Sequence, residues 1–303
     1  MKTVDVVVVG AGIAGLSAAI YLKRSSLSLV LLEKMAPGGK LLNIHEIDNY
    51  PALGSVSGPE LANKAFEQCN ALGVDYQYGN VMSIEKQGDV FYVTTDMERY
   101  EAKAVIIAVG TEKLEAGVPG ENEFNGRGVS YCATCDGNFF KGKEVAVIGY
   151  KDQAAEEAIY LAGLASRCYF INPKPLEAAE SHLEVLKGKE NVVMMEAELL
   201  RIEGDKLVNK IVVKSGEEEK EIPVSGVFPL YGEKSAASFL APLGVELERG
   251  FMVCDANMNT NVPGLYGAGD IVAKKLRQVV TAASDGALAA TSAIGYVHML
   301  RKK

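Results

Sequence analysis

The sequence has no tryptophan, three histidines and only five cysteines among its 303 residues. A sparse and odd-numbered set of cysteines does not indicate a scaffold built on disulfides. The histidines show no paired spacing of the kind that zinc sites use. The remaining composition, 48% hydrophobic and 23% charged, is typical of a folded globule, and the length favours two domains.

Long uncharged runs are scarce as well. One run, from Val6 to Leu22, spans 17 residues, which is short for a membrane span, and Asp5 lies at its edge. It could pass for a signal peptide, but its glycines have a better explanation, given below. With no other anchor or address signal in the chain, we expect a cytoplasmic protein with no membrane partner.

Positive charge is in deficit. The chain has 31 Lys and Arg against 39 Asp and Glu, a net charge of −8. Nucleic-acid binding usually requires a basic face, so no nucleic-acid partner is expected, although a local basic patch is not excluded. Glycine, in contrast, is abundant at 31 residues, which indicates many tight turns and sites lined by backbone.

The chain contains one unit twice. Residues 5–24 read DVVVVGAGIAGLSAAIYLKR, and residues 144–163 read EVAVIGYKDQAAEEAIYLAG. Each copy opens with a continuous apolar run, as a strand buried on both faces does, turns at a glycine and continues with helical periodicity. This is the start of a βαβ unit. We therefore predict an α/β fold with two Rossmann-like three-layer dinucleotide-binding domains, the second inserted in the first.

Segments beyond the repeats suggest the domain boundaries. The stretch VPGLYGAGD at 262–270 predicts a strand leading to a glycine turn, and the small-residue-rich segment 278–300 predicts a packed helix. We expect residues 1–113 and 244–303 to form a cofactor-binding domain. Residues 114–243 would then form the inserted domain, which carries a degenerate nicotinamide-nucleotide site.

The first copy carries a complete dinucleotide fingerprint. Gly10 makes the tight turn, Gly12 lets the backbone approach a pyrophosphate, and Gly15 allows close packing of helix on strand. The next apolar run ends in Glu33, which can accept a hydrogen bond from a ribose hydroxyl. The pattern predicts a dinucleotide site, the alternative being a glycine-rich structural turn.

The second copy has lost the residues that bind a nucleotide. Adding 139 to a residue number in the first copy aligns Gly12 with Lys151 and Glu33 with Asn172. A lysine side chain occupies the space that the pyrophosphate needs, and an amide replaces the ribose-binding acid. The scaffold thus persists while its ligand site is compromised, unless Lys151 swings aside and supplies charge.

Two cysteines form the sharpest local motif. Cys132 and Cys135 lie two residues apart in YCATCDG, a spacing that closes a small disulfide ring or supplies half a zinc site. The other cysteines are scattered, so we expect no metal and a dithiol/disulfide couple, with inert buried thiols as the alternative. Asp136 could protonate a leaving thiolate or could only form the turn. A redox dithiol after a dinucleotide-binding unit suggests flavin chemistry.

Along the whole chain these motifs resemble the low-molecular-weight thioredoxin reductase family. The resemblance is carried further by VPGE at 118–121 before the cysteine motif. It implies FAD as cofactor, thioredoxin as substrate and a homodimer. It also implies that Cys135 faces the flavin, that Cys132 attacks the protein substrate and that Asp136 donates and accepts the proton. A rotation of one domain would present the pair to flavin and substrate in turn.

The same resemblance assigns a flavin site. Further segments that carry it are PGGKL at 37–41, NYP at 49–51, GD at 269–270 and RQVVT at 277–281. Lys40 is a departure, because the family usually has glutamine there. In the family the aspartate contacts the ribityl chain, and the arginine and glutamine lie by the pyrimidine edge. The flavin-binding residues implied are Gly10, Gly12, Ile13, Ala14, Gly15, Glu33, Gly39, Lys40, Asn49, Gly110, Asp270, Arg277 and Gln278.

The electron donor is where the chain departs most from the family. NADPH-dependent members have an intact second glycine motif and an arginine-rich stretch for the 2′-phosphate, whereas residues 171–175 here read INPKP. Losing about three charge-assisted hydrogen bonds of roughly 1.5–3 kcal/mol each would weaken NADPH binding on the order of 1,000-fold or more. The degenerate site resembles the ferredoxin-dependent flavin thioredoxin reductases, so ferredoxin is the expected donor.

Three alternatives stay open at this point. In one, Lys151 and Lys174 hold the phosphates of NADPH in an atypical site. In another, the protein is a dithiol oxidase that passes electrons to oxygen. In the third, it is a flavoprotein redox sensor or partner-binding module without turnover.

Overall fold

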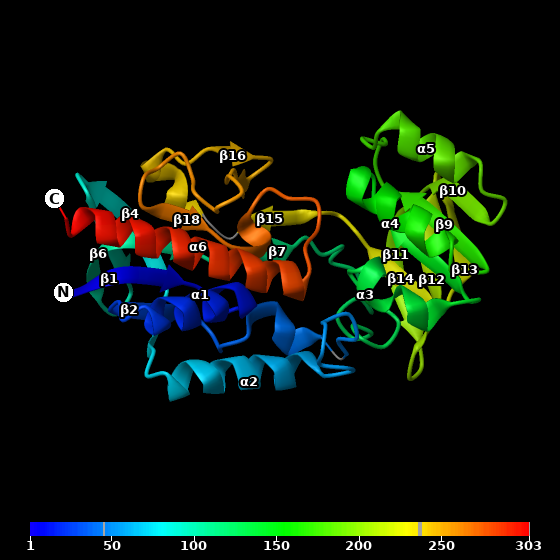
Figure 1. Cartoon of the computed structure of the whole chain (residues 1–303). Coiled ribbons are helices and arrows are strands. Elements are labelled where there is room, and N and C mark those ends of the chain that lie inside the picture. Colours follow the sequence, from blue (N-terminus) through cyan, green and yellow to red (C-terminus); the bar gives the residue numbers. More distant parts are fainter. Residues whose placement is uncertain (45, 236–237, 303) are drawn as a thin grey trace. The chain divides into compact units, whose positions relative to one another are not determined.

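The computed structural model describes residues 1–44, 46–235 and 238–302 (Figure 1). The chain divides into two compact units: unit 1 is Met1–Glu112 with Ser235–Lys303, and unit 2 is Lys113–Lys234. Unit 2 is therefore inserted in the sequence of unit 1. The chain returns to unit 1 at residue 235 rather than at the expected 244. The two crossings run through short paired strands, β7 (Thr111–Lys113) and β15 (Glu233–Ser235).

A seven-stranded sheet forms the centre of unit 1. Its order is β3-β2-β1-β6-β5-β4, and β18 also pairs with β6. The mutually parallel neighbours are β1 (Lys2–Val9), β2 (Leu29–Glu33), β3 (Asp75–Tyr78), β6 (Arg99–Ile107) and β18 (Leu265–Gly267). An antiparallel meander is added by β4 (Val81–Gln87) and β5 (Val90–Thr95). Because β6 is long, its first part pairs with β5 and its last part with β18.

Both faces of this sheet are buried. Val6 and Val8 face the helices α1 (Ile13–Arg24) and α6 (Val279–Leu300), which lie side by side in Figure 1. Val7 and Val9 face the opposite apolar layer, which includes side chains of β4, β5 and η3 (Ser238–Leu243). This explains why β1 is continuously apolar instead of alternating.

Shorter elements complete unit 1. The helix α2 (Gly58–Ala71) packs on α1, and Ser57 caps its N-terminus by accepting from the Glu60 N–H. Two 3₁₀ turns, η1 (Gly39–Asn43) and η4 (Gly269–Ile271), carry expected site residues. The strands β16 (Leu247–Glu248) and β17 (Phe251–Met252) form a small hairpin.

Unit 2 has the same three-layer plan. Its parallel sheet has the order β10-β9-β8-β14, with helices α4 and α5 on one face and the antiparallel strands β11-β12-β13 on the other. The parallel strands are β8 (Glu144–Ile148), β9 (Arg167–Asn172), β10 (Val192–Glu196) and β14 (Gly226–Pro229). The other elements are α3 (Ala133–Asp136), η2 (Gly137–Phe140), α4 (Asp152–Ala162), α5 (Glu180–Lys187), β11 (Glu198–Gly204), β12 (Val208–Ser215) and β13 (Glu218–Pro223).

The internal repeat extends to the hydrogen bonds. Strands β1 and β2 pair in the same register as β8 and β9, shifted by 139 residues. The turn after the first strand is also repeated: the Gly10 N–H donates to Leu32 O at 2.8 Å, and the Gly149 N–H donates to Ile171 O at 3.0 Å. The predicted α/β fold with two Rossmann-like, three-layer domains is thereby confirmed.

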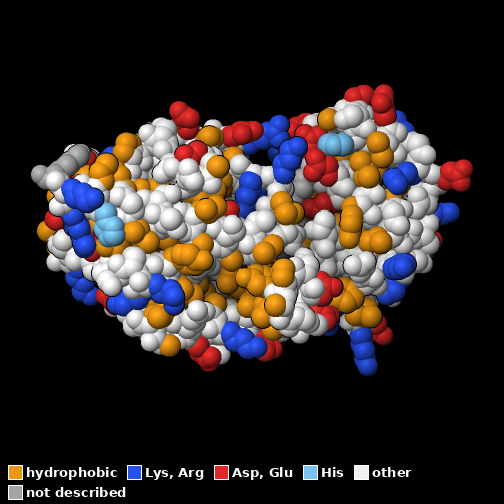
Figure 2. Space-filling view, viewed as in Figure 1, with side chains coloured by type: hydrophobic (Ala, Val, Ile, Leu, Met, Phe, Trp, Pro, Cys, Tyr) orange, Lys and Arg blue, Asp and Glu red, His pale blue; other side chains and the backbone are white. Residues whose placement is uncertain are grey.

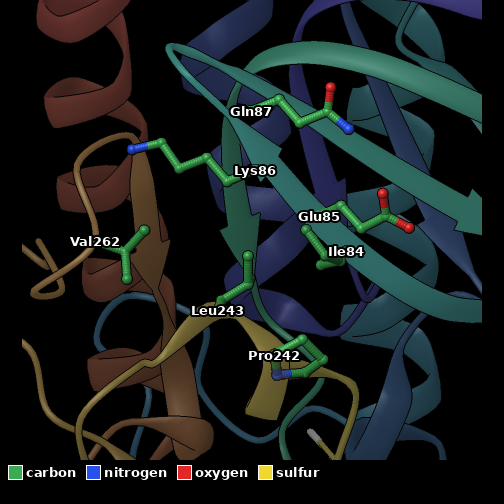
Figure 3. Close-up of a pocket in the computed structure, with 7 residues that line it drawn as sticks. All are labelled: Ile84, Glu85, Lys86, Gln87, Pro242, Leu243 and Val262. Atoms are coloured by element: carbon green, nitrogen blue, oxygen red, sulfur yellow. The ribbon is translucent and has the colours of Figure 1, made fainter.

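The surface carries both signs of charge. Figure 2 shows acidic and basic side chains interspersed with hydrophobic ones on the visible face. Within the described ranges, the helices all fall short of the length and apolar character needed to cross a membrane.

Close packing of α1 on α6 depends on small residues. A Cβ atom built on Gly286 would lie 2.0 Å from the carbonyl oxygen of Ala14. Ala282 and Ala289, on the same helix, are buried. The two helix backbones approach so closely that even a methyl group at position 286 has no room.

We therefore expect Gly286→Ala to lower the stability of unit 1 by about 1–3 kcal/mol, the usual cost of overpacking. Gly295→Ala, on the same helix, is the matched control, because a Cβ there meets nothing within 4 Å. It should raise stability by roughly 0.5–1 kcal/mol, since alanine restricts the unfolded chain. Urea unfolding of both variants measures the difference, and equal midpoints would refute the close approach.

Candidate active site

The expected cofactor residues gather at one edge of the unit 1 sheet. The strands β1, β2, β6 and β18 are parallel, so their carboxyl ends lie along the same edge. The glycine loop follows β1, Glu33 ends β2, Gly110 follows β6, and Asp270 follows β18. Open α/β sheets bind ligands at this edge.

The three fingerprint glycines play different parts. Gly10 has a φ of +101°, and a Cβ on Gly15 would lie 1.8 Å from the Gly10 carbonyl oxygen, so the fold itself requires both. A Cβ on Gly12, in contrast, would meet nothing within 4 Å. Gly12 is the N-cap of α1 and supplies no side-chain acceptor, so the first-turn N–H groups are available to an anion in that space.

The Glu33 carboxylate is held against this loop. Its Oε2 accepts from the Ala11 N–H at 2.8 Å, and its Oε1 accepts from the Met35 N–H at 2.9 Å. Each carboxylate oxygen has a second lone pair, so the group can still accept from ribose hydroxyls. The backbone thus fixes the acid beside the position that a dinucleotide would take.

Lys40 links three of the strand-end segments. From η1 its Nζ donates to Thr111 Oγ1 at 2.6 Å and lies 3.2 Å from Asp270 Oδ2. Arg277 Nε donates to the carbonyl oxygen of Asp270 at 3.2 Å, and its guanidinium lies 4.2 Å from the centre of the Phe251 ring. The lysine that departs from the family pattern therefore neutralises the aspartate of the expected flavin site.

Asn49 and Gln278 meet although 229 residues separate them. Asn49 Nδ2 donates to Gln278 Oε1 at 3.0 Å. Gln278 is also the N-cap of α6 and exchanges hydrogen bonds with Thr281 in a capping box. The remaining expected residues lie close by in the chain: Ile13 and Ala14 open α1, and Gly39 opens η1.

The cysteine pair is a disulfide in unit 2. Cys132 and Cys135 are joined, with their Cα atoms 5.3 Å apart, as the spacing predicts. Cys132 is the N-cap of α3, and its Sγ accepts from the Cys135 N–H at 3.2 Å. Both cysteines are half-buried, and Thr134 between them is exposed. After reduction, the same N–H would favour the thiolate form of Cys132.

Asp136 lies at the far end of this one-turn helix. Its N–H donates to the Cys132 carbonyl oxygen at 3.1 Å, which closes the turn. Its Oδ2 accepts from Ser130 Oγ at 2.6 Å. The Ala133 N–H donates to Glu157 Oε2 of α4 at 2.7 Å, so a second acid holds the loop from a neighbouring helix.

A buried carboxylate anchors the start of the redox loop, which we define as residues 131–136, the segment that contains the disulfide. Glu121 has no exposed surface, and it accepts from the N–H groups of Ala116 and Gly117 at 3.0 and 2.7 Å. It also accepts from the Tyr131 hydroxyl at 2.9 Å. Burial, together with this carboxylate, raises the pKa of Tyr131 well above its usual range. The residue before Cys132 is therefore fixed to the segment that enters unit 2.

The position equivalent to the dinucleotide site differs in unit 2. Helix α4 has Lys151 as N-cap and begins with an acid, Asp152, in its first turn. The ammonium groups of Lys151 and Lys174 lie 5.3 and 5.4 Å from the centre of the Tyr150 ring. Asn172, which replaces the ribose-binding acid, is buried and donates from Nδ2 to the Lys174 carbonyl oxygen at 3.1 Å.

The other three cysteines are free thiols. Cys69 and Cys168 are buried and Cys254 is half-buried, in line with the expectation that they pack as small apolar groups. Burial raises the pKa of Cys69 and Cys254 to about 11 and that of Cys168 to about 12.

Several contact residues were not predicted from the sequence. Thr111 directly follows Gly110, and Ser130 lies two residues before the first cysteine, so a search for hydroxyl groups beside the predicted motifs could have found both. Glu157 had no local signal, because it reaches the redox loop from 24 residues away.

Comparisons with known proteins agree with this arrangement. A sequence model of the pyridine nucleotide-disulphide oxidoreductases matches residues 4–286. The thioredoxin reductase of Bacillus subtilis (strain 168) is 40% identical over 306 residues, covering 99% of this chain and 97% of that protein. The crystal structure of thioredoxin reductase from Streptococcus pyogenes MGAS5005 is similar with a TM-score of 0.94 and 35% identity, covering 98% of this chain and 99% of the other.

A further similar structure bears a more specific title. The ferredoxin-flavin thioredoxin reductase from Clostridium acetobutylicum is 32% identical, with both chains covered completely and a TM-score of 0.57.

The chain joins a complete dinucleotide fingerprint to a disulfide, and it belongs to the pyridine nucleotide-disulphide oxidoreductase family. Within that family it belongs with the thioredoxin reductases. Thioredoxin reductases of this family bind FAD, the cofactor expected from the sequence. The residues of unit 1 fit that cofactor, because the open space at Gly12 is where its pyrophosphate would approach α1.

Gly12→Ala tests this fit. The new methyl group meets no protein atom and the φ of −69° suits alanine, so the apoprotein should lose only about 1 kcal/mol of stability, the usual cost of a poorer N-cap residue. FAD binding should weaken by about 10- to 100-fold, the equivalent of roughly 1–3 kcal/mol of overpacking against the pyrophosphate. Titration of apoprotein with FAD, followed by quenching of flavin fluorescence, measures the change. Gly15→Ala should destabilise the apoprotein far more, because its methyl group would lie 1.8 Å from the Gly10 carbonyl oxygen. Unchanged FAD affinity in Gly12→Ala would contradict the assignment.

Tyr131→Phe tests the buried anchor. It removes one donor from Glu121, so stability at pH 7 should fall by about 1–3 kcal/mol in urea unfolding. Because the pKa of Tyr131 is raised on folding, its contribution is complete below pH ~10, where the unfolded phenol is still protonated, and is lost as the pH rises further. The gap between wild type and variant should therefore narrow above pH ~10.

Tyr169→Phe is the control for this prediction. Its hydroxyl donates to the partly exposed Glu144 in the same unit, so its loss should cost less than about 1 kcal/mol. If the two variants lost the same free energy of unfolding, the third hydrogen bond to the buried Glu121 would contribute no more than one to a partly exposed carboxylate.

Proposed function

We propose that this chain is an FAD-dependent reductase of thioredoxin, or of a thioredoxin-like disulfide, that receives its electrons from reduced ferredoxin rather than from NADPH. The observation that carries the proposal is the contrast between the two units. Their backbones repeat, but only unit 1 keeps the side chains of a dinucleotide site.

The electrostatics of unit 2 support a donor other than NADPH. Asp152 places a carboxylate in the first turn of α4, where a dinucleotide's phosphates would be bound in a fingerprint site, and like charges repel there. Lys151 occupies the position that Gly12 leaves open in unit 1. Asn172 directs its amide to a backbone carbonyl and replaces the acceptor that a ribose needs.

The similar structure titled ferredoxin-flavin thioredoxin reductase supports the same donor. The potentials allow this direction of transfer. The reduction potential of a plant-type ferredoxin is about −400 mV and that of a thioredoxin about −270 mV. The difference of roughly 130 mV corresponds, for two electrons, to a favourable free energy of about 6 kcal/mol. The cytoplasmic location and the homodimer expected from the sequence are part of this proposal.

The redox loop then performs thiol–disulfide exchange. FAD, when bound, supplies a carrier that passes two electrons to the Cys132–Cys135 disulfide. The Cys132 thiolate attacks one sulfur of the substrate disulfide and expels the other as a thiolate. Cys135 attacks Cys132 in the mixed disulfide and releases the second substrate thiol, which restores the enzyme disulfide. Asp136 takes up and delivers the protons of these steps.

One observation favours a second candidate, a thioredoxin reductase that uses NADPH in an atypical site. The ammonium groups of Lys151 and Lys174 lie beside the same Tyr150 ring near the start of α4, and such a pair of cations could bind phosphate groups. The adjacent Asp152 weakens this candidate.

Anaerobic titration of the FAD-loaded protein distinguishes the ferredoxin-dependent candidate from the NADPH-dependent one. NADPH, NADH and reduced ferredoxin are added in turn while the flavin absorbance near about 450 nm is followed. We expect no bleaching by either nicotinamide, bleaching by ferredoxin, and thiols on added thioredoxin. Cys132→Ser is the control, since its flavin should still be bleached while no thioredoxin thiols form. Prompt bleaching by micromolar NADPH would refute the proposed donor. In a separate aerobic assay, rapid oxygen uptake with a small dithiol would instead favour an oxidase.

A further inference from the structure

Ser130 lies beneath the redox loop and contacts both of its ends. Its hydroxyl donates to Asp136 Oδ2 at 2.6 Å and accepts from the Cys132 N–H at 3.2 Å. The side chain is 6% exposed. Its own N–H donates to the carbonyl oxygen of Val227 at 3.0 Å, which fixes Ser130 to β14 in the parallel sheet. The position of the Asp136 carboxylate is therefore set from the core of unit 2.

A second acceptor is within reach of the same hydroxyl. The Cys132 carbonyl oxygen lies 3.4 Å from Ser130 Oγ. A hydroxyl has one proton to donate and two lone pairs to accept with. When Asp136 is a carboxylate, the Ser130 proton points to it. When Asp136 is protonated on Oδ2, its O–H can donate to Ser130 Oγ while the serine proton turns to the Cys132 carbonyl. When the proton lies on Oδ1, from which it can pass to a thiolate, the serine hydroxyl still donates to Oδ2. All groups stay hydrogen-bonded in both states without movement of a heavy atom.

We propose that Ser130 is the positioning residue that holds Asp136 in place through both of its protonation states during thiol–disulfide exchange. This inference rests on the proposed function, in which Asp136 moves the protons. Exchange converts an enzyme dithiol and a substrate disulfide into an enzyme disulfide and a substrate dithiol. Asp136 takes a proton from a cysteine thiol and gives it to the departing substrate thiolate, so it must accept and donate from one position.

The test compares substrate disulfides whose leaving thiolates differ in pKa. A thiolate of low pKa departs without protonation, whereas an alkyl thiolate gains from an acid. The FAD-loaded enzyme is reduced with stoichiometric dithionite, which makes the test independent of the natural donor. It is then mixed anaerobically with oxidised thioredoxin, with hydroxyethyl disulfide or with the aromatic disulfide DTNB, and the single-turnover rate of thiol formation is measured.

We expect Ser130→Ala to slow the reduction of thioredoxin and hydroxyethyl disulfide by about 10- to 100-fold, within the range of a general-acid contribution. The rate with DTNB should change less than about twofold, because its leaving thiolate needs no proton. Ser130→Thr keeps the hydroxyl and should restore most of the lost rate. Ser215→Ala, which removes a hydrogen bond to the Glu196 carbonyl elsewhere in unit 2, should leave all three rates unchanged.

A double-mutant cycle completes the test. Ser130→Ala should add little to the loss caused by Asp136→Asn, because both changes remove the same proton transfer. Equal slowing with DTNB and the alkyl disulfide, or full additivity with Asp136→Asn, would overturn the inference and leave Ser130 a structural residue. If the wild-type protein reduces hydroxyethyl disulfide but not thioredoxin, the substrate of the proposed function fails while Ser130 is still tested.

Discussion

The close approach of one helix to one strand is the constraint on which unit 1 depends. A Cβ on Gly15 would lie 1.8 Å from the Gly10 carbonyl, so α1 can begin immediately after β1 only with glycine at that position. This places the N-terminus of α1 at the edge where the parallel strands of the sheet end. The remaining contacts of the edge, including the Glu33 carboxylate on the Ala11 N–H, follow from that short connection.

Unit 2 has the same turn between strand and helix but lacks the residues that would bind a nucleotide there. Its turn has the same backbone hydrogen bond, but Ala154 stands at the position equivalent to Gly15. The close contact in unit 2 is made by Gly149, where a Cβ would lie 2.4 Å from the Ala154 side chain. The residues that only a ligand would need, at the positions of Gly12 and Glu33, have been replaced. The backbone of the turn is thus repeated in unit 2, whereas the glycine and the acid of a dinucleotide site are absent from it.

The difference between residues needed for packing and residues needed for a ligand also explains how far the sequence could predict the structure. The apolar runs predicted β1 and β8 because strands buried on both faces cannot alternate, and the repeat predicted two domains of one kind. The glycine loop of unit 1 and the disulfide were predictable because glycine and cysteine spacings are tied to particular chemistry. The other residues of the edge were expected only from the resemblance to a known family. The contacts of Lys40 with Thr111, and of Glu157 with Ala133, were not, because long side chains meet across the fold without any local pattern.

The three free thiols are buried or half-buried, and this burial determines which sulfurs of the protein can take part in redox chemistry. Burial raises the pKa of Cys69 and Cys254 to about 11 and that of Cys168 to about 12, so at neutral pH these sulfurs are almost entirely protonated thiols. Since only thiolates exchange with disulfides, these sulfurs are kept out of thiol–disulfide exchange. The number of free thiols in the folded chain therefore changes by two at a time, as the Cys132–Cys135 disulfide is reduced or formed again.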